Sequence, residues 1–204
     1  MGRIFNPDNF LWRWGAKVAD YVFLSCLWIL CSIPVVTIGA STIALFDAAA
    51  RCVHGNEGGT YRRFFRTFRQ ELGRGIALTI LWAVCGWLLN VGYQVMTQLG
   101  DGSRNWNILS IVYFCTLFIP LGVACWSVAL ESRFTYGFGD LHRNAFLFTF
   151  AHLPHTFAIV VLLVLAINVL LNIFPLIMII PGLTAYLQSC FAERVLRKYM
   201  PPEE

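Results

Sequence analysis

Residues 21–46 read YVFLSCLWILCSIPVVTIGASTIALF, and none of them is charged. An uncharged apolar stretch of about 18 or more residues is a candidate membrane helix. Pro34 lies in the middle of this stretch, and the residue before a proline disfavours helical backbone. The segment from Trp14 to His54 therefore contains either one long membrane span or two shorter spans that meet at Pro34.

The distribution of basic residues decides between these alternatives, because such residues collect on the cytoplasmic side of a membrane protein. All but one of the 15 Lys and Arg residues fall in four short segments, and Arg104 is the exception. The four segments are residues 3–17, 51–74, 133–143 and 194–198. Two crossings before residue 51 return the second segment to the side of the first. We therefore predict two spans, Trp14–Ile33 and Val35–Val53.

The rest of the chain contains further uncharged apolar runs that are long enough to cross a membrane. The chain is 58% hydrophobic and 13% charged, whereas soluble domains are about 45–50% apolar and about 25% charged. Four more spans are predicted at about Gly75–Thr97, Trp106–Leu130, Thr156–Phe174 and Pro175–Arg194. We therefore expect an all-α membrane protein with about six transmembrane helices in three hairpins. Residues 1–204 would form a single polytopic domain with both termini in the cytoplasm.

Two segments between the predicted spans have the pattern of short cytoplasmic amphipathic helices. Residues 61–72 read YRRFFRTFRQEL, and residues 139–154 form a similar but less charged segment. An aromatic stripe beside an arginine stripe is typical of a helix that lies in the membrane interface. Phe64, Phe65 and Phe68 are expected to face lipid or the helix bundle. The candidate contacts to a partner protein or to lipid are Arg62, Arg63, Arg66 and Arg69.

A few polar side chains fall inside the predicted spans and form a candidate intramembrane polar site. An ionisable group at membrane depth is often functional, and Asp47 is such a group, although an ion pair with Arg51 one turn later explains it more simply. Thr37 and Ser41 could bind a ligand at a helix N-terminus, but small residues more often allow close helix packing. Asn90 could line a polar cavity, and an interhelical hydrogen bond is the simpler interpretation.

The sequence contains no recognisable catalytic motif and no cysteine or histidine pattern that indicates a metal site. We therefore expect a protein that is not an enzyme and has no catalytic residue, bound metal or cofactor. The net charge of +4 fits contact with anionic membrane lipid. Nucleic acid is not expected as a partner.

Three features follow one another in the sequence: a small-residue turn, a loop with Gly and an acid, and a basic helix. In this order they resemble the YesL family of bacterial membrane proteins. They are Ile33–Leu45, IPVVTIGASTIAL, then Gly55–Gly59, GNEGG, and then the helix at 61–72. The family is a domain of unknown function whose genes often accompany carbohydrate ABC importers and polysaccharide-degrading enzymes. The resemblance therefore implies a multi-pass protein of the bacterial cytoplasmic (inner) membrane, accessory to carbohydrate uptake, with ABC importer subunits as candidate partners. It implies no catalytic residue.

Two other functions remain open at this stage. The first is a small-solute transporter or channel, which a weak similarity between the segments that follow Pro34 and Pro175 would favour if it reflects a parallel repeat. A continuous polar cavity that reaches the middle of the membrane would support it. The second is an intramembrane enzyme or a lipid-binding protein. A cavity open sideways to lipid, with a clustered acid and histidine, would support that one.

Overall fold

The computed structural model describes residues 10–54, 59–99, 105–134, 136–196 and 198–199, and in these ranges the regular structure is entirely helical. The helices are α1 (Phe10–Cys31), α2 (Ile38–Ala48), α3 (Thr60–Gln70), α4 (Leu72–Leu99), α5 (Asn105–Glu131), α6 (Phe138–Ala151), α7 (Leu153–Asn172) and α8 (Ile180–Leu196). Three shorter helical segments are the 3₁₀ turns η1 (Val35–Thr37) and η3 (Phe174–Met178) and the π-helical η2 (Ala49–His54).

The prediction of an all-helical chain is confirmed for these residues, and each predicted span overlaps a helix. The spans predicted at Trp14–Ile33, Gly75–Thr97, Trp106–Leu130 and Thr156–Phe174 correspond to α1, α4, α5 and α7, respectively. The span predicted at Val35–Val53 is divided among η1, α2 and η2, and the last span is divided between η3 and α8. The predicted amphipathic segments form α3 and α6.

The helices differ in length from the six predicted spans. By length and composition, two helices among the described residues could cross a membrane, Leu72–Gln98 in α4 and Leu153–Asn172. α2 has 11 residues and α8 has 17. Both are shortened because the chain turns through a 3₁₀ segment beside a proline, Pro34 before η1 and Pro175 within η3.

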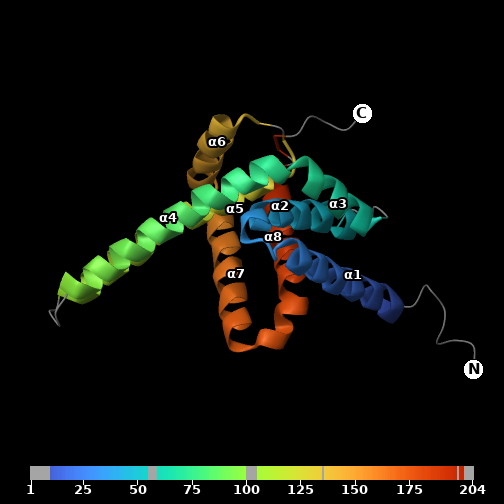
Figure 1. Cartoon of the computed structure of the whole chain (residues 1–204), viewed down its shortest axis with the longest axis horizontal. Coiled ribbons are helices and arrows are strands. Elements are labelled where there is room, and N and C mark those ends of the chain that lie inside the picture. Colours follow the sequence, from blue (N-terminus) through green and yellow to red (C-terminus); the bar gives the residue numbers. More distant parts are fainter. Residues whose placement is uncertain (1–9, 55–58, 100–104, 135, 197, 200–204) are drawn as a thin grey trace, which may run out of the picture.

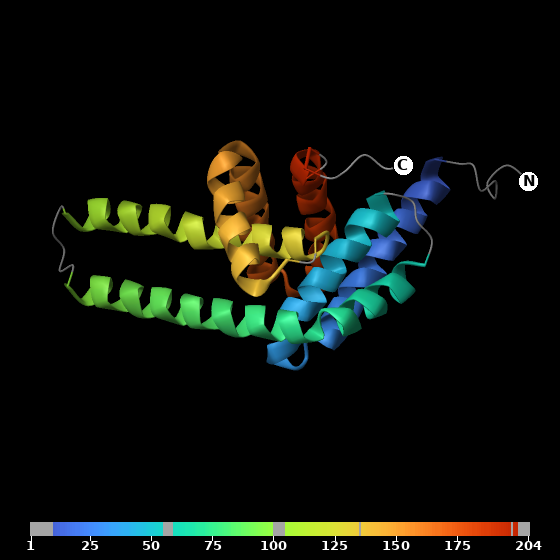
Figure 2. The same ribbon diagram turned by 90° about the horizontal axis from the view of Figure 1, so that it is seen from above.

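The helix pairs diverge from a common centre (Figure 1). α4 and α5 extend together to one side, α7 and α8 run downward and are joined at η3, and α1 points to the opposite side from α4. The view from above shows α4 and α5 running alongside each other well beyond the other helices (Figure 2). The central bundle is therefore formed by α1, α2, α3 and α8 and by the ends of α4, α5 and α7 nearest to them.

α2 is the central helix and separates two clusters of buried side chains. Ile43 and Phe46 of α2 belong to a cluster that includes Trp126 of α5, whose indole Nε1 donates a hydrogen bond to Thr156 Oγ1 at 2.9 Å. Ala44, Leu45 and Ala48 of α2 belong to a second cluster, which contains Phe64 of α3. The hydrophobic effect therefore holds α3 against the bundle through a fully buried phenylalanine.

α2 and α4 cross with their backbones in direct contact. A Cβ atom on Gly39 would lie 2.3 Å from the carbonyl oxygen of Gly75, and one on Gly75 would lie 2.4 Å from the Cα atom of Ala40. The Gly39 N–H donates to Thr79 Oγ1 of α4 at 2.8 Å. The small residues near the start of α2 therefore serve close helix packing.

Candidate functional site: a buried charged layer and an exposed arginine face

Asp47, near the C-terminal end of α2, is buried and is held by two arginines and a threonine. Its Oδ2 accepts hydrogen bonds from Arg63 Nε at 2.9 Å and from Thr67 Oγ1 at 2.7 Å, both on α3. Its Oδ1 lies 2.9 Å from Arg51 Nε in η2. A buried carboxylate is tolerated when its charge is paired and hydrogen-bonded. The Asp47–Arg51 pair is therefore present, and Arg63 is a second cation at the same carboxylate.

A second ion pair joins α4 to α5. Arg74 Nη1 lies 3.0 Å from Glu131 Oε1 and 3.8 Å from Glu71 Oε2. Burial raises the pKa of Glu131, and the carboxyl of Glu71 raises it further, while Arg74 acts in the opposite direction. A single guanidinium therefore serves two neighbouring carboxyl groups at this junction.

A third ion pair, between Arg133 and Glu193, joins the chain just after α5 to the end of α8. Burial lowers the pKa of Arg133, while Glu193 opposes the shift, and the charges of Arg51 and Asp47 also act on Arg133. The three groups of charges thus lie at the ends of helices that meet in one region. We call this set the charged layer; it consists of Asp47, Arg51, Arg63, Glu71, Arg74, Glu131, Arg133 and Glu193.

The opposite side of α3 is an exposed arginine face, formed by Arg62, Arg66 and Arg69. No acidic residue occurs in Thr60–Gln70, so the charge of this face is not neutralised within the helix. Phe65 is 49% exposed and lies beside it, whereas Phe64 is buried and Phe68 packs against the core cluster. The aromatic residues predicted to share one face are thus divided between the core and the surface.

The four residues of the candidate intramembrane polar site do not form one site. Thr37 Oγ1 donates to the backbone oxygen of Cys31 at 2.6 Å, and Ser41 Oγ lies 2.7 Å from Ser32 Oγ, both near the start of α2. Asp47 lies at the other end of that helix. Asn90 lies on α4, where its Oδ1 accepts from Gln94 Nε2 at 3.0 Å.

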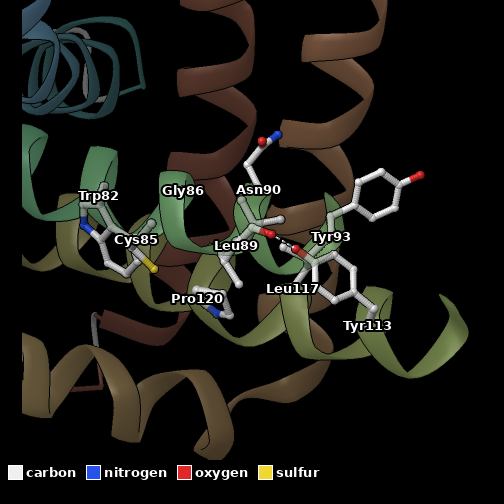
Figure 3. Close-up of a pocket in the computed structure, with 11 residues that line it drawn as sticks. Trp82, Cys85, Gly86, Leu89, Asn90, Tyr93, Tyr113, Leu117 and Pro120 are labelled. Atoms are coloured by element: carbon white, nitrogen blue, oxygen red, sulfur yellow. Dashed lines mark hydrogen bonds between the residues drawn. The ribbon is translucent and has the colours of Figure 1, made fainter. Parts of the chain in front are cut away.

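Asn90 belongs to an open cavity of about 500 Å³ between α4 and α5 (Figure 3). The walls are mainly apolar and aromatic, and include Trp82, Leu89 and Pro120. Tyr113 closes one side by donating a hydrogen bond from its hydroxyl to the Leu89 carbonyl oxygen (Figure 3). This cavity has the character of an apolar groove with few polar groups, and it does not extend as a polar path through the bundle.

The described residues contain no group of three or more His, Cys, Asp or Glu side chains placed to hold a metal ion. The basic side chains of the charged layer are engaged with carboxylates. What the arrangement offers chemically is therefore a network of buried carboxylates paired with partly exposed arginines and, on its outer side, the arginine face of α3.

Comparison with known proteins shows that part of the chain is similar to an uncharacterised family. Residues 21–93 match the model of a family described as protein of unknown function, DUF624. The match covers α2, α3 and much of α4, and so includes Asp47, Arg63 and the arginine face. This description does not name the YesL family. No curated protein and no solved structure matches the chain significantly.

Proposed function

We propose that this chain is a noncatalytic, multi-pass protein of the bacterial cytoplasmic membrane that binds a partner protein through the arginine face of α3. The proposal rests on how α3 is held against the bundle. Buried Phe64 and the contacts of Arg63 and Thr67 with Asp47 fix one side of α3. The backbone positions of Arg62, Arg66 and Arg69 on the other side are thereby held in place, which lowers the entropy that the helix loses on binding.

Membrane insertion through three hairpins is supported by the exposed apolar surfaces of the helices. Trp87 on α4 is 66% exposed, and Leu171 on α7 is 81% exposed. α4 has 28 residues, and at about 1.5 Å per residue it is about 42 Å long. This length exceeds the hydrocarbon core of about 30 Å, so α4 is long enough to cross a bilayer with tilt. The six-span arrangement, with both termini in the cytoplasm, is part of this proposal.

Cysteine labelling in membranes is expected to reveal this topology. The test uses a variant whose native cysteines are replaced. Gly73→Cys and Asp140→Cys should react only after the membrane is permeabilised, because the proposed topology places the basic segments 51–74 and 133–143 in the cytoplasm. Gln98→Cys, at the far end of α4, should react from outside in intact cells. External labelling of Gly73→Cys would overturn the two-span interpretation of Trp14–His54 and, with it, the six-span arrangement.

The proposed partner is a subunit of a carbohydrate ABC importer, and this part rests on the resemblance of the sequence to the YesL family. The chemistry of the arginine face adds that the contact surface of the partner should be acidic. A surface of like charge would cost several kcal/mol on contact.

Charge reversal on α3 should separate this chain from its partner. The triple variant Arg62→Glu, Arg66→Glu and Arg69→Glu should lower recovery of co-purifying subunits from native membranes by about tenfold or more, because like charges would then meet across the contact. The matched control is Arg143→Glu, Arg194→Glu and Lys198→Glu, three exposed cations outside α3, and its recovery should equal that of the parent. Equal losses in the two variants would show that α3 is not the docking surface.

The alternative function, a small-solute transporter or channel, makes a different prediction for the purified protein. Solute flux into liposomes that contain this chain alone, abolished by Asp47→Asn or Asn90→Ala, would favour it. Both described cavities have mainly apolar walls, and a hydrated solute needs many polar partners to replace its water. The structure therefore gives this alternative less support than partner docking.

A further inference from the structure

A second cavity, of about 330 Å³, lies within the central bundle between α1, α2, α5, α7 and α8. Its walls include Leu45 and Phe46 of α2, which are each only 4% exposed, and Ala166 of α7. An apolar cavity of about 150 Å³ in another protein stays dry and binds benzene. This cavity has about twice that volume, so it has room for a longer apolar group.

Three polar side chains on the walls donate hydrogen bonds within the chain. Trp28 Nε1 donates to Thr42 Oγ1 at 3.1 Å, and Thr184 Oγ1 donates to the Ile180 carbonyl oxygen at 2.7 Å. Gln188 Nε2 donates to the Ile159 carbonyl oxygen at 3.3 Å. These groups are therefore poorly placed to replace the water of a sugar or an ion, and the walls favour an apolar occupant.

The cavity is open to the outside of the bundle, and we call its side at Ile167 of α7 the mouth. This residue lines the cavity and is also 45% exposed, whereas the other lining residues are buried or half-buried. The surface of α7 around the mouth is apolar, with Leu165 at 55% exposed. No charged residue occurs between Arg143 and Glu193 in the sequence. The α7–α8 segment that borders the mouth thus carries no cation for the carboxylate of a free fatty acid, and its apolar surface is one that membrane hydrocarbon would cover.

We propose that this cavity binds one alkyl chain of a membrane phospholipid, which enters sideways past Ile167 while the headgroup stays outside. The lining contains neither an acid nor a histidine, so the role is binding and not chemistry on the lipid. A chain in this position would contact five helical elements at once and would stabilise the bundle by burying apolar surface. The inference rests on the membrane location that is part of the proposed function.

Photolabelling in nanodiscs tests the proposal. The probe is phosphatidylcholine with a diazirine near the end of one acyl chain, and labelled peptides are mapped by mass spectrometry. The parent protein should be labelled at Leu45 or Phe46, which lipid around the outside of the bundle does not reach. Ala166→Phe, which fills the cavity, should lower that labelling by about tenfold, the factor supplied by burial of about two methylene groups. Leu165→Phe, an outward substitution on the same helix, should leave it unchanged.

The outward residues Leu165 and Leu171 report the membrane location separately. Label on them without label on Leu45 or Phe46 would overturn the cavity proposal and leave the membrane location intact. The absence of label from every part of α7 would overturn the membrane location itself. A free fatty acid with the same diazirine, added to nanodiscs of unlabelled lipid, shows whether the occupant is a free acid or a phospholipid chain. Labelling of Leu45 or Phe46 by the free acid but not by the phospholipid would overturn the assignment to a membrane lipid. Since the parent protein alone gives the main readout, a folding defect in Ala166→Phe would not remove the test.

Discussion

Gly75→Ala is expected to destabilise the protein by at least about 1–3 kcal/mol, the usual effect of forcing an extra carbon into a packed interior. The new Cβ atom would lie 2.4 Å from the Cα and the N atoms of Ala40. Both of these belong to the backbone of α2, so no side-chain rotation can relieve the overlap, and α2 must move away from α4. Thermal unfolding of the detergent-purified protein, followed by circular dichroism, should show a clearly lower midpoint.

The matched control is Gly73→Ala, two residues earlier on the same helix. A Cβ atom at Gly73 would meet nothing within 4 Å, and alanine is the better helix former by about 0.5–1 kcal/mol. Its unfolding midpoint should therefore equal or exceed that of the parent. Similar midpoints for the two alanine variants would show that α2 and α4 do not cross at these glycines.

Asp47→Ala should cost about 1–3 kcal/mol of folding stability, because it removes the buried acceptor of the hydrogen bonds from Arg63 and Thr67. The Asp47 side chain is 3% exposed, and its loss would leave Arg63 and Arg51 facing each other without the anion. Since native proteins are stable by about 5–15 kcal/mol, this loss is a large share of the total. Expression level and the thermal unfolding midpoint should both fall.

Asp140→Ala is the control for a lost carboxylate, because Asp140 is exposed in the first turn of α6. A carboxylate there interacts favourably with the N-terminal end of the helix dipole by about 0.3–1 kcal/mol, so its removal should lower stability only slightly. If Asp47→Ala were no more harmful than this control, the buried network around Asp47 would not contribute to the fold as described.

Helix positions were predictable from the sequence because apolar runs and prolines act locally. The turn at Pro34 could be anticipated since proline restricts the residue before it. The lengths of α2 and α8 could not, because a 3₁₀ turn takes up residues that a count of apolar positions assigns to the helix. The same limit applies to η2, where the helix widens after Ala48 without a sequence signal that we recognise.

The charged layer was only partly predictable. The Asp47–Arg51 pair could be anticipated from its spacing, because residues four apart share one face of a helix. The sequence alone groups Arg63 with the other arginines of residues 61–72, because periodicity shows which residues share a face and not how far the helix is rotated against its neighbour. Glu193 is 60 positions from Arg133, and no local pattern indicates such a contact.

The polar site expected from Asp47, Asn90, Thr37 and Ser41 shows a related limit. All four are polar residues of apolar helices, which is a statement about composition. Their separation in space follows from helix length and crossing angle, and these depend on contacts such as that between Gly39 and Gly75. Nothing in the sequence around Asn90 shows that α4 extends beyond the bundle at that point.

The order of the ion pairs along the chain bears on how the protein is made. A ribosome delivers the chain from its N-terminus, and early segments begin to fold before later ones exist. Each long-range ion pair can form only after its later residue has been synthesised. These later residues are Arg63 for Asp47, Glu131 for Arg74 and Glu193 for Arg133. The Arg133–Glu193 pair can form only when α8 has been made, so Arg133 lacks this partner while the next 60 residues are synthesised. Biogenesis of this protein should therefore be sensitive to anything that delays or shortens α8.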